Sequence, residues 1–223
     1  MRGWPGWILT AALFLGLGMI GVLYGIYAYG ASAITTPLTY SSYRVPVAIR
    51  RQYLSVEAPG INSLPKLNPL TVWVAWYRAS DPGSVVGGEL RLLGLAARTF
   101  PLAEHVGSGR RHAAEMARTV LISRNWSLQQ TADTILAKSY FGRGAYGLEA
   151  ASHAYYGLPA ARLSAEQRLV LIALMKGPDY YDPVCKRERF EQRYLQVAAL
   201  SSLRTDSDAP SRALQGLLPA VCR

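Results

Sequence analysis

The sequence predicts a mostly α-helical domain behind one N-terminal transmembrane helix. An uncharged, largely apolar run covers residues 7–33. Two Ser-x-x-Gln signatures, at Ser127 and Ser164, precede apolar stretches, as capping boxes do at helix starts. Apolar residues also recur at helical spacing in residues 110–122 and 187–203. Together these patterns indicate helices along most of the chain.

The apolar run is long enough to span a membrane. A bilayer core requires about 20 apolar helical residues, and aromatic residues often mark its two interfaces. Aromatic residues lie near both ends of this run: Trp4, Trp7, Tyr24, Tyr27 and Tyr29. A cleaved signal peptide is the alternative, because residues 31–33 read Ala-Ser-Ala. Cleavable apolar regions are usually about 7–15 residues long, which favours an uncleaved signal anchor.

The distribution of charge predicts the orientation of the chain. Arg2 precedes the span, and no further basic residue occurs before Arg44. This pattern favours a short cytoplasmic N-terminus, residues 1–6, with the rest of the chain outside. Without Arg2 the chain has 23 basic and 14 acidic residues, a balance of +9. A tethered basic domain is drawn to anionic lipid or polyphosphate, and nucleic acid is not expected as a partner.

The cysteines and histidines predict no metal centre. Cys185 and Cys222 could pair in an oxidising periplasm or remain free thiols, and the sequence leaves both open. The histidines, at positions 105, 112 and 153, have no metal-ligand spacing among themselves or with the cysteines.

Composition divides the chain into segments. We expect a linker at residues 34–44, a folded domain at 45–204 and a C-terminal tail at 205–223. Three prolines and a glycine predict a loop at residues 57–70. The next segment, residues 71–79, suits either a strand or a buried helix, because periodicity cannot decide over so short a run.

The stretch "YFGRGAYGLEAASHAYYG", residues 140–157, combines glycines with aromatic residues directly after a predicted helix. Glycines allow sharp turns, and aromatic side chains pack such turns against neighbouring helices. Together with "LSAEQRLVLIALMKGPDYYDP", which begins at Leu163, it resembles the peptidoglycan glycosyltransferases of glycosyltransferase family 51. The resemblance covers roughly residues 45–200.

This resemblance implies a lysozyme-like helical fold with a membrane-dipping segment. It implies an enzyme that polymerises lipid II into glycan strands and releases undecaprenyl pyrophosphate. The implied partners are lipid II, growing glycan strands, the cell membrane and other cell-wall synthases. The implied place is the bacterial inner (cytoplasmic) membrane, crossed once, with the domain on the periplasmic or outer side.

By resemblance, the catalytic base is Glu57, found by counting back from Gly87 and Gly88. A base of this kind is a carboxylate in a partly apolar pocket, and Glu57 is flanked by Val56 and Ala58. The family has an Asp where this chain has Ala58. A solvated glutamate at the entrance of a loop is the alternative interpretation.

A second carboxylate, Glu115, ends "RHAAE", which resembles the family's R-K-x-x-E motif. In the family this segment holds the pyrophosphate of the donor, which implies roles for Arg111 and His112 and stabilisation of the departing charge. A loosely held Mg²⁺ or Mn²⁺ at the pyrophosphate is the cofactor that the resemblance allows. Arg193 matches a further family motif near the C-terminus. An ordinary intrahelical pair of Arg111 and Glu115 is the alternative.

The chain departs from the family at "GGELRLLG", residues 87–94, where the family has a Ser-Thr-x-x-Gln-Gln type of sequence. Gly87 and Gly88 are kept, and Arg91 can supply some of the positive charge. An active polymerase and a catalytically inactive protein that binds lipid II or cell-wall synthases, as a scaffold or regulator, both fit this pattern. A lytic enzyme is a third interpretation, disfavoured by the anchor and the basic segment.

Overall fold

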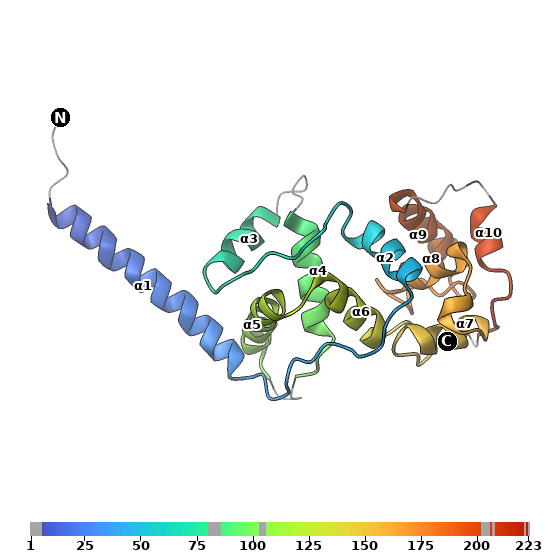
Figure 1. Cartoon of the computed structure of the whole chain (residues 1–223), viewed down its shortest axis with the longest axis horizontal. Helices are drawn as coiled ribbons and strands as arrows, with labels where there is room; N and C mark the ends of the chain where they lie inside the picture. Colours follow the sequence, from blue (N-terminus) through green and yellow to red (C-terminus); the bar gives the residue numbers. More distant parts are fainter. Residues whose placement is uncertain are drawn as a thin grey trace. The chain divides into compact units, whose positions relative to one another are not determined.

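The computed structural model describes residues 6–79, 86–102, 106–201, 206, 208–220 and 222 (Figure 1). Regular secondary structure in these residues is helical, and they contain no β-strand, although an isolated bridge pairs Tyr140 with Tyr146. The predicted mostly α-helical class is therefore confirmed.

The chain divides into two compact units, each assembled from separate parts of the sequence. The first unit comprises residues 1–38 and 65–125, and the second comprises residues 39–64 and 126–223. Described helices of the first unit are α1 (Gly6–Ala31), α3 (Thr71–Ala79), α4 (Val86–Arg98) and α5 (Ser108–Asn125). Those of the second are α2 (Val47–Glu57), α6 (Leu128–Lys138), α7 (Leu148–Tyr156), the short 3₁₀ helix η1 (Ala160–Arg162), α8 (Ala165–Leu174), α9 (Arg187–Leu200) and α10 (Ala209–Ala213).

Helix α1 matches the predicted transmembrane segment. It has 26 residues and is long and apolar enough to cross a membrane. Its large side chains are exposed over most of its length, with Phe14 at 70% and Leu15 at 75%. Gly30, near its end, is buried. An apolar helix whose side chains are left uncovered by the described protein is suited to lipid surroundings.

The segment that the sequence left undecided, residues 71–79, forms helix α3. The side chain of Asn68 accepts hydrogen bonds from the backbone N–H groups of Leu70 and Thr71, both at 2.9 Å, and so caps the start of the helix. Val72 and Ala75 are buried, as expected for residues three apart on one helical face. Three large apolar side chains of α3 are exposed: Val74, Trp76 and Tyr77.

Both predicted capping boxes are present. The Ser127 hydroxyl accepts from the backbone N–H of Gln130 at 3.2 Å, and the Gln130 side chain accepts from the backbone N–H of Ser127 at 2.8 Å. Ser164 and Gln167 make the same pair of bonds before α8. The last six residues of α8 are all buried, which places this helix in the core of the second unit.

The glycine-rich loop, residues 140–147, turns where a side chain would collide with its surroundings. Gly142 has φ +89°, and a Cβ there would lie 2.8 Å from Cβ of Pro178. Gly147 has φ +87°, and its Cβ would lie 2.5 Å from the carbonyl oxygen of Ala137. These two positions therefore require glycine.

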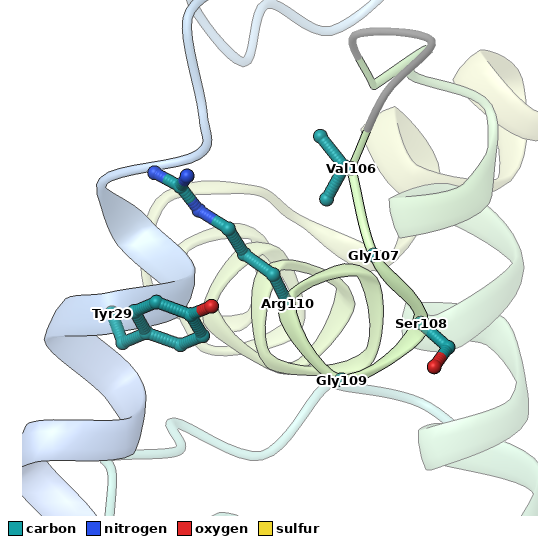
Figure 2. A pocket seen from close by; sticks show the side chains of 6 residues that line it. All are labelled: Tyr29, Val106, Gly107, Ser108, Gly109 and Arg110. Atoms are coloured by element: carbon teal, nitrogen blue, oxygen red, sulfur yellow. The ribbon is translucent and has the colours of Figure 1, made fainter.

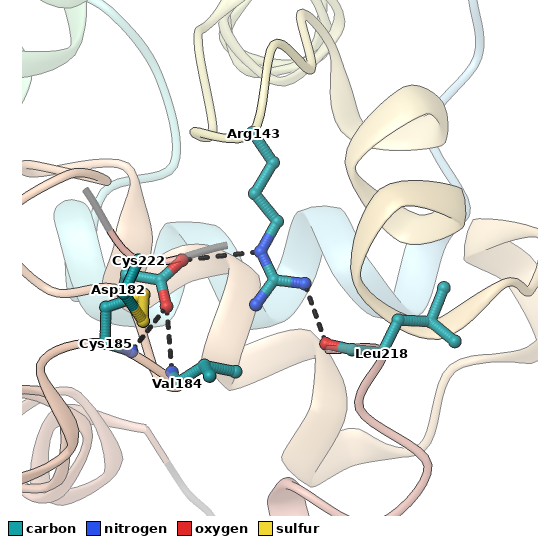
Figure 3. Close-up of a disulfide and its surroundings, with 6 residues drawn as sticks. All are labelled: Arg143, Asp182, Val184, Cys185, Leu218 and Cys222. Atoms are coloured by element: carbon teal, nitrogen blue, oxygen red, sulfur yellow. Dashed lines mark hydrogen bonds and ion pairs between the residues drawn. A yellow bond between two sulfur atoms is a disulfide. The ribbon is translucent and has the colours of Figure 1, made fainter. Parts of the chain in front are cut away.

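A disulfide joins Cys185 to Cys222, with the two Cα atoms 5.3 Å apart (Figure 3). Nearby, the Arg143 guanidinium donates to the carbonyl oxygen of Leu218 at 2.9 Å and pairs with the Asp182 carboxylate at 3.3 Å. Asp182 in turn accepts from the backbone N–H of Cys185 at 2.9 Å. Of the two states that the sequence left open for the cysteines, the structure has the paired one.

We expect the loss of this disulfide to destabilise the second unit. The bond closes a sequence separation of 37 residues, and bonds of this kind typically contribute about 2–4 kcal/mol. A Cys185→Ser/Cys222→Ser variant should therefore melt about 5–15 °C below the wild type, by circular dichroism in detergent. A reductant should lower the melting temperature of the wild type and leave that of the variant unchanged. Equal melting temperatures for both proteins in oxidising buffer would contradict this prediction.

Candidate active site

Helix α5 carries three of the predicted site residues on its outward side. Arg111 and His112 are exposed, and the Glu115 side chain is 25% exposed. The opposite side of the helix is formed largely by small residues and is buried: Ala113, Ala114 and Ala117 are at most 6% exposed. The stripe of small apolar residues thus fixes the helix, and the polar side chains remain accessible to a ligand.

Glu115 forms an ion pair with a neighbouring helix. Its carboxylate accepts from Nε of Arg98 of α4 at 2.5 Å. The predicted alternative was a pair within α5, whereas this contact joins α5 to α4. A charge-assisted bond of this length orients the carboxylate. It also links α4 and α5, which both carry predicted site residues.

Arg118, one turn beyond Glu115, is a structural arginine that sequence analysis did not single out. It is 3% exposed and donates to the carbonyl oxygens of Phe100 at 2.7 Å and Pro101 at 2.8 Å. Burial lowers the pKa of this guanidinium, and the nearby Glu115 charge opposes that shift. Arg118 therefore fastens the segment after α4 to α5.

Helix α4 holds Gly87, Gly88 and Arg91. The two glycines are half-buried in its first turn, and Arg91 is exposed. A Cβ on Gly87 would lie 3.8 Å from the carbonyl oxygen of Ala79, an ordinary contact distance. Packing alone therefore does not demand glycine at Gly87.

Glu89 is a carboxylate in the same turn that sequence analysis treated as part of a departure from the family. It is half-buried, and burial raises its pKa above the usual value. The signal that could have found it is a carboxylate directly after the glycine pair, at the start of a largely apolar helix. A half-buried acid on the helix that contacts α5 is a further candidate for the site.

We expect Glu89→Gln to stabilise the protein at neutral pH. Because the folded-state pKa is raised, the folded protein binds the proton more tightly, and stability falls as pH rises through the interval between the unfolded and folded pKa values. Glutamine removes the cost of the buried charge, so the melting temperature should rise by about 1–3 °C at pH 7. The gain should largely vanish near pH 4, because glutamate at this pH is mostly protonated in both the folded and the unfolded protein. A gain that is equal at pH 4 and pH 7 would contradict this explanation.

In the second unit, Glu57 is the last residue of α2. It is half-buried between Val56 and Ala58, which are 3% and 2% exposed. The backbone N–H of Ala58 caps the helix by bonding to the carbonyl oxygen of Leu54. Both sequence neighbours of Glu57 are thus buried, at a regular helix end.

Arg50 lies two turns before Glu57, on the same face of α2, and pairs with Asp133 of α6. Its guanidinium reaches both oxygens of the carboxylate, at 3.0 and 2.9 Å, and the two side chains are 16% and 12% exposed. Burial raises the pKa of Asp133, and the bond and charge of Arg50 oppose that shift. The pair was not predicted from the sequence, although Asp133 interrupts an apolar stripe.

Arg193 lies on α9 and is half-buried, next to the buried Tyr194. Its Nε is buried and makes no hydrogen bond within the described part of the chain. Helix α9 contacts α2, the helix of Glu57. The predicted site residues thus form two groups, one on α4 and α5 of the first unit and one on α2 and α9 of the second. Their roles stay predictions.

The described residues contain no group of three or more His, Cys, Asp or Glu side chains placed to hold a metal ion. His105 lies outside the described residues.

Comparison with known proteins places half of the predicted site residues within a known family. Residues 95–201 match the family model described as Transglycosylase. Residues 95–201 belong to the transglycosylase family. The resemblance found in the sequence is thereby confirmed. This transglycosylase region includes Arg111, His112, Glu115 and Arg193. The other predicted site residues precede it: Glu57, Gly87, Gly88 and Arg91.

The curated relatives of the chain include penicillin-binding proteins and biosynthetic peptidoglycan transglycosylases. The chain is 29% identical over 180 residues to penicillin-binding protein 1A of Mycolicibacterium smegmatis, covering 74% of this chain and 22% of that protein. It is 33% identical over 96 residues to the biosynthetic peptidoglycan transglycosylase of Acinetobacter baylyi, covering 40% and 43%. It is also 33% identical over 114 residues to that of Burkholderia thailandensis, covering 48% and 42%. The chain thus spans about a fifth of the penicillin-binding protein.

Proposed function

We propose that the protein is a membrane-anchored peptidoglycan glycosyltransferase that polymerises lipid II into glycan strands and releases undecaprenyl pyrophosphate. The observation that carries the proposal is the transglycosylase-family match, which includes helix α5 with its outward Arg111 and His112. The N–H donors of an exposed guanidinium and an exposed imidazole on a fixed helix are suited to bind an anionic pyrophosphate.

In the proposed reaction, the 4-hydroxyl oxygen of the acceptor sugar attacks C1 of the donor sugar. Glu57 takes the hydroxyl proton as the new C–O bond forms. The bond between C1 and the pyrophosphate oxygen breaks with inversion, and the leaving group takes that electron pair. Arg111 and His112 would stabilise the charge that develops on the pyrophosphate, while Arg98 keeps Glu115 oriented beside them.

The proposal includes a divalent cation that binds together with the pyrophosphate of the substrate. Since the described residues offer no three-ligand group, Mg²⁺ or Mn²⁺ would be bound mainly by pyrophosphate oxygens and water. Glu115 is the carboxylate of α5 that we assign as a protein ligand. When bound, the cation would neutralise charge on the leaving group.

Three features support a membrane location and an outward-facing domain. Helix α1 can cross a membrane by length and composition. Trp76 and Tyr77 of α3 are 65% and 83% exposed, which suits the expected membrane-dipping segment, because aromatic side chains favour the interface. The Cys185–Cys222 disulfide suits an oxidising compartment such as the periplasm. Growing glycan strands and other cell-wall synthases are the further partners that we propose.

A second candidate function is a non-catalytic protein that binds lipid II or cell-wall synthases. It is favoured by the absence of Ser, Thr and Gln from residues 87–94 and by Ala58 at the position of the family's Asp.

The test is polymerisation of fluorescent lipid II by the purified full-length protein in detergent, with Mg²⁺ or with EDTA. A ladder of products that lysozyme digests would support the glycosyltransferase, and its loss in EDTA would support the cation. Lipid II binding without a ladder would favour the second function. If the protein gives no ladder and does not bind lipid II, both candidate functions are overturned. Shortening of preformed glycan strands would instead identify a lytic enzyme.

A further inference from the structure

The end of helix α1 packs on the first turns of α5, within the first unit. A Cβ on the buried Gly30 would lie 2.0 Å from the carbonyl oxygen of Ala113 and 2.8 Å from the backbone nitrogen of Ala114. These are backbone atoms, which cannot turn aside as a flexible side chain can. The two helix backbones therefore touch at Gly30, and any other residue there would push them apart.

This contact falls on the segment to which we assign pyrophosphate binding. Ala113 and Ala114 stand between His112 and Glu115 in the sequence, so α1 supports α5 from the side opposite the exposed Arg111 and His112. Small residues on both helices, Gly30 on one and Ala113 and Ala114 on the other, permit this close approach.

A second contact joins α1 to Arg110, the residue of α5 that precedes Arg111. Figure 2 shows the Tyr29 ring from α1 beside the Arg110 side chain from α5, where both line a pocket with residues 106–109. The guanidinium carbon lies 5.4 Å from the centre of the Tyr29 ring, and Nη2 donates to the Ser32 hydroxyl at 3.2 Å. A cation over an aromatic face at this distance is attracted to it.

The length of α1 allows this docking outside the membrane. A 26-residue helix is about 39 Å long, whereas about 20 residues cross the hydrocarbon core. The surplus of about six residues is enough to include Tyr29 and Gly30. The earlier glycines of the helix, such as Gly25, have no atom within 4 Å of a Cβ position, in contrast to Gly30.

We infer that the last turns of α1 act as a positioning element for the substrate site. Through Gly30 and Tyr29 they fix the first turns of α5, and so the depth of Arg111 and His112 relative to the membrane surface where the lipid pyrophosphate lies. The anchor is then part of the binding site, and Gly30 and Tyr29 are positioning residues. This inference rests on the proposed function.

The first test compares Gly30→Leu with Gly25→Leu, the same change at an open position of the same helix. The full-length proteins would be placed in nanodiscs. For Gly30→Leu we expect the Kd and KM for lipid II to rise about tenfold or more, with kcat changed less. We also expect faster amide hydrogen exchange in residues 108–116 and unchanged exchange in the second unit. Gly25→Leu should match the wild type within about twofold.

Tyr29 provides an independent pair of variants, in case Gly30→Leu fails to fold. Tyr29→Ala removes the ring beside Arg110 and should raise the Kd for lipid II about threefold to tenfold. Tyr29→Phe keeps the ring face and should restore wild-type affinity.

The outcomes separate this inference from the proposed function. Unchanged exchange in α5 of Gly30→Leu would overturn the inference even if the wild type polymerises lipid II. Faster exchange with unchanged Kd and KM would also overturn it, because the contact would then be structural only. If the wild type binds lipid II without polymerising it, the Kd comparison still decides the inference. If the wild type binds no lipid II, both proposals fail.

Discussion

Replacing Glu57 by glutamine is expected to lower the kcat of lipid II polymerisation by about 10²–10⁴-fold, the usual contribution of a general base. The amide has nearly the same shape as the carboxylate but cannot take the proton of the acceptor hydroxyl. Because Glu57 is the half-buried last residue of α2, a glutamine of the same size should leave the fold intact. Lipid II binding should stay within about twofold, because the loss concerns the transition state.

A matched control is Glu188→Gln, which makes the same chemical change at an exposed position of α9 in the same unit. It should polymerise lipid II at the wild-type rate. Circular dichroism would verify that all three proteins have the same helix content. A Glu57→Gln protein that retains a third or more of the wild-type kcat would show that the base is another residue.

Replacing Asp133 by asparagine is expected to lower the free energy of unfolding by about 3–5 kcal/mol, because Arg50 would stay buried without its charge partner. For a chain of this size the melting temperature should fall by about 6–20 °C. Burial raises the pKa of Asp133 in spite of Arg50, so the pair does not fully offset the cost of burying its carboxylate. An Arg50→Met/Asp133→Leu variant should therefore recover most of the loss.

Asp179→Asn, at an exposed position of the same unit, is the control and should melt within about 1 °C of the wild type. Thermal melts of the four proteins in one detergent would measure the effect. Two results would contradict the explanation: an Asp133→Asn protein as stable as the wild type, or a double variant less stable than the single one.

Local features of the fold could be predicted because their causes lie within a few residues. The capping boxes at Ser127 and Ser164 involve partners three residues away, and the pattern alone places both helix starts. Helix α3 could not be decided in this way. Its nine residues hold apolar side chains on nearly every side, and the outcome depends on which of them the rest of the unit covers.

The surroundings of the site residues depend on contacts between distant parts of the sequence. Arg50 and Asp133 are 83 positions apart, and Arg98 reaches Glu115 from another helix. The charge pattern along one helix indicates ion pairs only between residues three or four positions apart. Neither of these pairs could therefore be predicted from it. The close contact of α1 with α5 at Gly30 also joins distant parts of the sequence. In addition, glycines are common in membrane helices, so Gly30 did not stand out in the apolar run.

The Cys185–Cys222 bond also implies that the protein resists proteolysis differently on the two sides of a membrane. Thiols stay reduced in a cytoplasm, where the segment around Leu218 would be held by hydrogen bonds such as those from Arg143 and to Tyr155. A segment held in this way opens more often, and proteases act on open segments. We therefore expect protein that fails to be exported to be degraded faster than exported protein. The disulfide would then selectively protect the exported molecules.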